Sequence, residues 1–114
     1  MATVTITVRD GSLTIVPPHV KISPKDLSIT WNLSPADGWQ FAPASQGIVC
    51  ETAVKPPFQP WSGAPAAPGA GPNQYTAKGA AVAASTRHKY SINLVNGGGQ
   101  TMAIDPEILN EPQP

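Results

Sequence analysis

Proline and glycine recur so often in this chain that long helices have no room to form. Fourteen prolines and ten glycines are spread over 114 residues. Proline ends a helix because it lacks an amide hydrogen and clashes with the preceding turn, and glycine adds to the entropy cost of ordering the backbone. The core must therefore be built from strands. The length fits one domain, residues 1–114, in which folding hides roughly two-thirds of the chain surface.

Two segments show clear alternation of apolar and polar side chains, the pattern of a strand with one buried face. In segment 27–34 the odd positions are apolar and include Trp31, and segment 88–94 repeats the alternation at even positions. Seven or eight short strands without an amphipathic helix predict an all-β fold, a two-sheet β-sandwich with antiparallel or mixed sheets. Trp31 is expected in its core. The shorter candidate strands are 3–8, 13–16, 20–22, 39–41, 48–50 and 101–104.

Residues 55–73 differ in composition from the rest of the chain, being rich in proline, alanine and glycine. The six prolines of this segment favour an extended backbone. Segments 57–60 and 65–68 both fit the P-x-x-P pattern that binds aromatic grooves, although Lys55 lies too close to Pro57 to serve as the usual flanking cation. A long loop inside a compact domain is typically a functional flap or a mobile excursion.

Phe58 and Trp61 are the large side chains of this loop. An exposed pair would form a binding patch, whereas a buried pair would form a lid over one end of the sandwich. We favour the lid, because large aromatic side chains gain stability from burial. We expect it to pack near Trp39 or Phe41, while residues 63–71 stay mobile. Phe58, Trp61 and Trp39 are the candidates for partner binding.

Charge and cysteine content narrow the class of partner and the compartment. Seven basic and seven acidic residues give a formal net charge of zero, without the basic surplus of a nucleic-acid binder or the basic stripe of a membrane-surface helix. We therefore expect neither nucleic acid nor membrane as a partner.

Cys50 is alone, so no intrachain disulfide can form, which fits a reducing compartment. We expect a cytoplasmic protein, or a periplasmic one if a signal peptide precedes this sequence.

Five segments stand in an order that resembles a known architecture: Val-Pro-Pro-His-Val at 16–20, Ile-Ser-Pro-Lys-Asp at 22–26, Leu-Ser-Ile-Thr-Trp at 27–31, Lys-Tyr-Ser-Ile-Asn-Leu at 89–94 and Asp-Pro-Glu-Ile-Leu-Asn at 105–110. This order resembles the cupredoxin-like sandwich, in which a tyrosine strand leads into the metal-ligand loop. The closing segment is similar to that of small bacterial cupredoxin-like proteins of uncharacterised function. The resemblance implies a Greek-key β-sandwich and no established activity.

The copper site of that family does not carry over to these residues. A type 1 copper centre needs a thiolate, two imidazoles and a weak axial thioether, grouped largely in the loop before the last strand. Here that loop, 95–101, contains neither cysteine nor histidine, and residues 39–41 stand where another imidazole would be expected. Met102 is the one nominal match. We therefore predict no type 1 copper and no cofactor.

A metal site of a different kind would need residues that converge across the sandwich. The weak candidates are His19, Cys50, His88 and Met102. The alternative is that they have ordinary structural roles, because buried cysteine commonly behaves as a small hydrophobic residue. We favour these structural roles and expect His88 at a strand surface or edge and His19 at a bend.

Catalytic motifs are lacking. The sequence has no Gly-x-Ser-x-Gly or His-Glu-x-x-His pattern, and Asp105 with Glu107 is the one close acidic pair. The glycines at 97–99 predict a turn rather than a phosphate-binding loop, because no helix follows them. The sequence therefore favours a non-enzymatic, copper-free cupredoxin-like binding or structural module, acting on an unknown protein or small molecule. The alternatives are a copper electron carrier, an interaction module using the proline-rich loop, and a small enzyme without a recognisable motif. A second copy of the chain, paired through sheet edges, is a further candidate partner.

Overall fold

Strands and turns make up the computed structural model, which describes residues 2–9, 12–34, 38–43, 46–69 and 73–112. Within these ranges there is no helix, and so none long and apolar enough to cross a membrane. The all-β prediction is confirmed. The strands are β1 Ala2–Arg9, β2 Ser12–Val16, β3 His19–Ile22, β4 Ser28–Leu33, β5 Gln40–Phe41, β6 Ile48–Cys50, β7 Ala67–Pro68, β8 Gln74–Lys78, β9 Thr86–Val95, β10 Thr101–Ile104 and β11 Glu107–Asn110.

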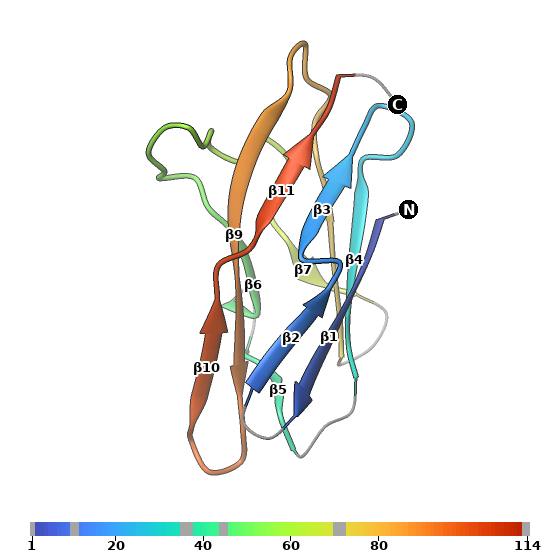
Figure 1. Cartoon of the computed structure of the whole chain (residues 1–114). Helices are drawn as coiled ribbons and strands as arrows, with labels where there is room; N and C mark the ends of the chain where they lie inside the picture. The colour runs from blue at the N-terminus through green and yellow to red at the C-terminus, as the bar shows by residue number, and fades with distance from the viewer. Residues whose placement is uncertain (1, 10–11, 35–37, 44–45, 70–72, 113–114) are drawn as a thin grey trace.

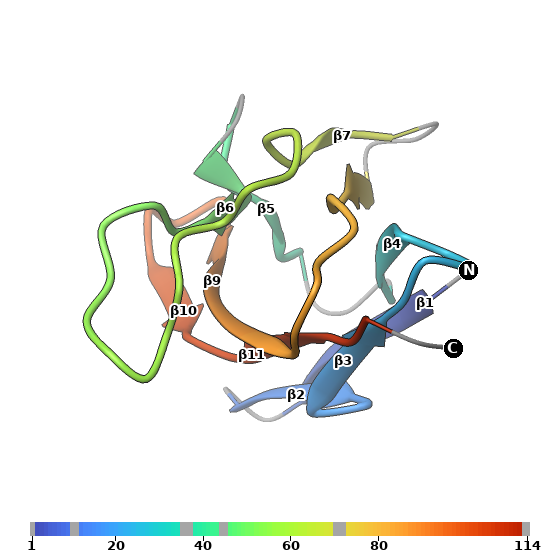
Figure 2. The same cartoon turned by 90° about the horizontal axis from the view of Figure 1, so that it is seen from above.

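Two mixed sheets face each other as a sandwich (Figure 1, Figure 2). The first has the strand order β2-β1-β4-β8-β7, with β1 parallel to β4 and the other pairs antiparallel. In the second, β9 pairs with β10 and then β11 along one side and with the short strands β5 and β6 along the other, and β3 adds in parallel to β11. The long strand β9 is therefore the centre of the second sheet.

The chain changes sheets between β2 and β3. Only Pro17 and Pro18 separate these strands, yet β2 pairs with β1 in the first sheet and β3 pairs with β11 in the second. Neither proline has an amide hydrogen to donate to a ladder, so the hydrogen-bonded strand is interrupted at this point. The interruption lets two consecutive strands contribute to both layers of the sandwich.

Alternating side chains from both sheets fill the core. Trp31 on β4 and Tyr90 on β9 are fully buried, and their rings contact each other across the sandwich with centroids 5.2 Å apart. The prediction for Trp31 is therefore correct. Around this pair pack Val4, Ile6 and Val8 from β1, Ile29 and Leu33 from β4, and Ile92 and Leu94 from β9.

Three strands were not predicted from the sequence. β8 pairs with β4 and buries Tyr75 and Ala77, β7 adds a two-residue edge to it, and β11 pairs with both β9 and β3. The last strand was expected at 101–104, but the chain forms a further strand after Asp105 and Pro106. Beyond them β11 continues along the same side of β9 that β10 occupies.

Candidate functional site

His88 is a structural residue of the inner face, not the surface or edge residue that was predicted. Its side chain is 1 % exposed. The Nδ1 atom lies 3.0 Å from the Gln59 carbonyl oxygen, which can only accept, so this nitrogen is the donor. The Nε2 atom lies 2.7 Å from Thr86 Oγ1 and accepts a hydrogen bond from that hydroxyl. Both ring nitrogens are thus occupied, and the imidazole has no lone pair left for a metal.

Two of the other candidate ligands, Met102 and His19, do not converge on His88. Met102 pairs with Leu94, six residues along β9 from His88, or about 20 Å at the rise of a strand. His19 begins β3, opposite Glu107, with its side chain exposed. Among the described residues, no group of three or more histidine, cysteine, aspartate or glutamate side chains is arranged to hold a metal ion.

Cys50 is half-buried on the inner face, opposite Tyr90. Burial raises the pKa of its thiol to about 12, against a smaller opposing effect of the Ala66 backbone N–H. It lines a hollow of about 200 Å³ together with Trp61 and Ala66. A thiol that stays protonated is a poor nucleophile at neutral pH.

Tyr90 offers no acid–base chemistry near neutral pH either. Burial raises the pKa of its phenol to about 12, and the neighbouring Trp31 indole N–H lowers it only in part. Neither polar atom makes a hydrogen bond of ordinary geometry with the described residues. The Tyr90 hydroxyl and the Trp31 indole N–H are both enclosed by the core, so no substrate can reach them.

Trp61 closes one flank of the sandwich, as a lid residue should. It is 6 % exposed, its indole N–H donates to the Ala64 carbonyl oxygen at 2.8 Å, and its ring meets the His88 ring edge-on at 5.4 Å. The predicted location near Trp39 or Phe41 is wrong. Phe41 pairs with Leu94, whereas Trp61 covers the opposite half of β9.

Phe58 lies on the outside of the same half of β9. The Arg87 guanidinium and the Lys89 ammonium sit 5.0 and 5.1 Å from the centre of its half-buried ring. Arg87 in turn donates to Glu107 at 2.7 Å. Two cations therefore already occupy the ring that a partner would use.

The proline-rich loop is tied to the sandwich by backbone hydrogen bonds. Ala64 N donates to Lys78 O at 3.0 Å, Ala67 and Pro68 pair with β8, and Gly69 N donates to Gln74 O at 2.7 Å. Residues 63–71 were expected to stay mobile; residues 64–69 make these hydrogen bonds to the sandwich, and residues 70–71 lie outside the described ranges. Figure 2 shows the segment after β6 projecting from the flank of β9.

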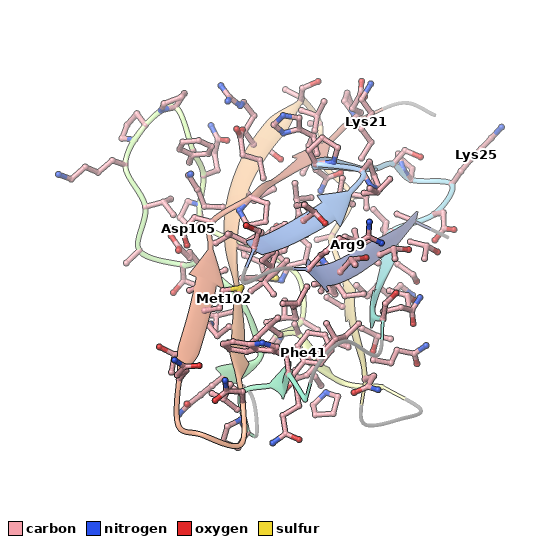
Figure 3. The ribbon with its side chains drawn as sticks, turned by 60° about the horizontal axis from the view of Figure 1, so that its bottom comes forward. Arg9, Lys21, Lys25, Phe41, Met102 and Asp105 are labelled. Carbon is pink, nitrogen blue, oxygen red and sulfur yellow. The ribbon has the colours of Figure 1, made fainter. Side chains whose placement is uncertain are left out.

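Trp39 lines an open hollow together with residues of the β9–β10 turn and β10. In Figure 1 this hairpin lies at one end of the sandwich. The hollow has a volume of about 520 Å³ and is widely open to solvent. Trp39 precedes β5 on one side of β9, and Met102 belongs to β10 on the other. Figure 3 shows Met102 and Phe41 toward this end. The described lining residues are Trp39, Gly99, Gln100, Thr101 and Met102.

Asn96 organises the turn beneath this hollow. Its Oδ1 atom accepts from Gly98 N at 2.9 Å and from Gln100 N at 3.0 Å, and its Nδ2 atom donates to Gln100 Oε1 at 2.8 Å. Gly99 adopts φ of +81°, a conformation that side chains disfavour. The turn thereby holds the Gln100 side-chain amide through its oxygen, and within the described residues the Gln100 NH₂ group has no hydrogen-bond partner.

Gln100 and Thr101 were not singled out from the sequence. Their position beside Trp39 depends on β5 and β10 pairing with opposite sides of β9, and neither residue stands in a recognisable motif. The sequence signal was limited to the Asn-Gly-Gly-Gly turn, which placed the hairpin correctly. No protein-family model and no curated protein sequence matches this chain. Support for a binding role of the hollow therefore comes from its own geometry and lining.

Proposed function

We propose that this chain is a non-enzymatic, copper-free cupredoxin-like binding module whose ligand site is the Trp39 hollow. One observation carries the proposal. Of the three aromatic side chains predicted to bind a partner, Trp61 is buried, Phe58 is covered by two cations, and Trp39 lines an open hollow. Binding sites are typically concave, with aromatic surface and a few polar groups.

The state of the titratable groups supports a binding role over an enzymatic one. Cys50 and Tyr90 have pKa values raised to about 12 by burial, so neither ionises near neutral pH. Both nitrogens of His88 are engaged by Gln59 and Thr86. A nucleophile or general base needs an accessible group with a pKa near the working pH. None of these three groups meets that need.

The positions of the sulfur and imidazole groups support a copper-free module. A type 1 centre needs its thiolate, imidazoles and thioether around one point. Met102 and His88 are separated by about 20 Å along β9, and His19 faces outward. Adding Cu(II) to the reduced protein should therefore give no intense visible charge-transfer band.

Nuclear magnetic resonance of the labelled protein tests the site directly. Libraries of neutral, anionic and cationic small molecules and short peptides would be added to the wild type and to Trp39→Ala. We expect bound compounds to shift the Trp39 indole signal and the amides of residues 99–102, and these shifts to vanish in the variant. Shifts grouped instead around Cys50 and Ala66, or none in any library, would contradict the proposal.

A further inference from the structure

The lining of the Trp39 hollow combines an indole, a primary amide, a hydroxyl and a thioether, and none of its described side chains is charged. The cations of β9 lie elsewhere, because Lys89 is six residues from Val95 at the hairpin end, about 20 Å along the strand. A charged ligand would lose water here without gaining a counter-charge. Charge complementarity therefore favours a neutral occupant.

A purely apolar occupant fits no better. It would cover the Gln100 amide and the Thr101 hydroxyl, both exposed, and would leave these groups without water and without a partner. The occupant needs an apolar face for the indole and hydrogen-bonding groups around its rim. A sugar ring has this construction, with C–H bonds on its faces and hydroxyls at its edge.

We propose that the Trp39 hollow binds a neutral carbohydrate chain, an inference that rests on the proposed function above. Trp39 supplies a rigid, flat surface that loses little conformational entropy on binding. Gln100 Nε2 donates to a sugar oxygen, and the Thr101 hydroxyl donates or accepts. Asn96 holds the Gln100 amide in place before the ligand arrives, which lowers the ordering cost of binding.

The shape of the hollow indicates a chain of sugars rather than one enclosed ring. Its volume is about 520 Å³ and it opens widely to solvent. A single sugar would keep much of its surface in water, so its affinity should be weak. Affinity should rise with chain length as neighbouring rings contact the turn and Met102.

Affinity electrophoresis and calorimetry with defined glycans test this inference. The probes are soluble neutral glucans, mannans, galactans and xylans and their oligosaccharides, with polygalacturonate as the charged comparison. We expect one neutral class to bind, with affinity at least tenfold lower in Trp39→Ala and several-fold lower in Gln100→Ala. Phe58→Ala is the matched aromatic control on the other half of β9 and should bind like the wild type.

Thermal unfolding of each variant shows whether it is folded. If Trp39→Ala does not fold, Trp39→Phe, which keeps a smaller aromatic ring, takes its place. Glycan binding that survives both Trp39 and Gln100 substitutions would overturn the inference, as would preference for the charged polymer. If no glycan binds while peptides or other small molecules still shift the Trp39 signal, the carbohydrate inference fails and the binding site stands. If nothing shifts that signal, both fail.

Discussion

Trp61 shows how one side chain can fix a segment composed mainly of proline, alanine and glycine. Its backbone N–H donates to the Glu51 carbonyl oxygen, its indole N–H donates to the Ala64 carbonyl oxygen, and its ring packs against His88. Prolines pre-extend the chain and lower the entropy lost on ordering it, but they supply little to bury. The tertiary contact comes from the indole.

Replacing Trp61 by alanine should cost about 3–5 kcal/mol of unfolding free energy, because the substitution removes a buried aromatic ring. Urea denaturation measures the loss. Chymotrypsin should also cut at Phe58 faster than in the wild type, since the lid is released. Trp61→Phe keeps a ring and loses the indole hydrogen bond, so it should cost less. A loss below 1 kcal/mol in Trp61→Ala would show that the loop is held by other contacts.

Cys50 should react slowly in the native protein. Burial raises the pKa of its thiol to about 12, so almost none is thiolate at pH 8. Alkylation with iodoacetamide, followed by mass spectrometry, should be much slower than in the urea-unfolded chain at the same pH. Equal rates in the two states would mean that the Cys50 thiol is exposed in the folded protein.

At the scale of elements, glycine is required where the backbone of one segment packs directly against another segment and leaves no room for a Cβ atom. A Cβ atom on Gly63 would collide with the Lys78 carbonyl oxygen and lie 2.8 Å from the Trp61 ring. That carbonyl also accepts from Ala64 N, so it cannot move without breaking the tie between loop and β8. Gly97, in the β9–β10 turn, has nothing within 4 Å of the same position.

Gly63→Ala should therefore destabilise the fold by about 1–3 kcal/mol, the usual cost of forcing atoms into a packed site. Gly97→Ala is the matched control and should change stability by less than about 0.5 kcal/mol, as surface substitutions do. Denaturant titration of the two variants beside the wild type gives both numbers. Similar stability for the two variants would show that the loop can shift away from Lys78.

The strands that the sequence predicts most clearly are those with an unbroken alternation. Segments 27–34 and 88–94 each present one apolar face, and both are central strands. β8 alternates as well, but its five residues run into an alanine-rich stretch that hid the boundary. β11 follows Pro106, which predicts an ending, and only the tertiary pairing with β3 and β9 makes it a strand.

The site was only half predictable for a related reason. Trp39 is conspicuous as a large side chain near a turn, so composition singles it out. Gln100 joins it because two strands remote in sequence flank β9, and that adjacency has no local signature. His88 was misplaced because imidazole is usually at least partly exposed. Its burial depends on partners at Gln59 and Thr86, which periodicity does not reveal.

At the scale of the whole molecule, folding takes two weak acids out of water, Tyr90 fully and Cys50 in part. Cys50 and Tyr90 lie opposite each other on β6 and β9. Burial raises their pKa values to about 12, from 9.0 for the thiol and 10.0 for the phenol. The folded state therefore keeps protons that the unfolded chain has already released in this range.

Stability should fall as the pH rises from about 9 through 12. Groups with a raised folded-state pKa contribute fully below their unfolded pKa and lose that contribution above it, at up to about 1.4 kcal/mol per pH unit and group. Urea unfolding at pH 7, 9, 10 and 11 measures the slope, which should begin near pH 10 rather than 9 in Cys50→Ser. A flat profile to pH 11 would mean that both groups ionise freely in the folded protein.

The first residue of β1 and the last of β11 lie at the end of the sandwich away from the β9–β10 hairpin (Figure 1). A molecule tethered through either strand to a bead, a membrane anchor or a neighbouring domain would therefore present the Trp39 hollow outward, free of the tether. Copies strung in tandem could all point their hollows at one repetitive target. Several weak contacts made at once would raise the overall affinity through effective concentration, so a shallow site would still bind a long polymer tightly.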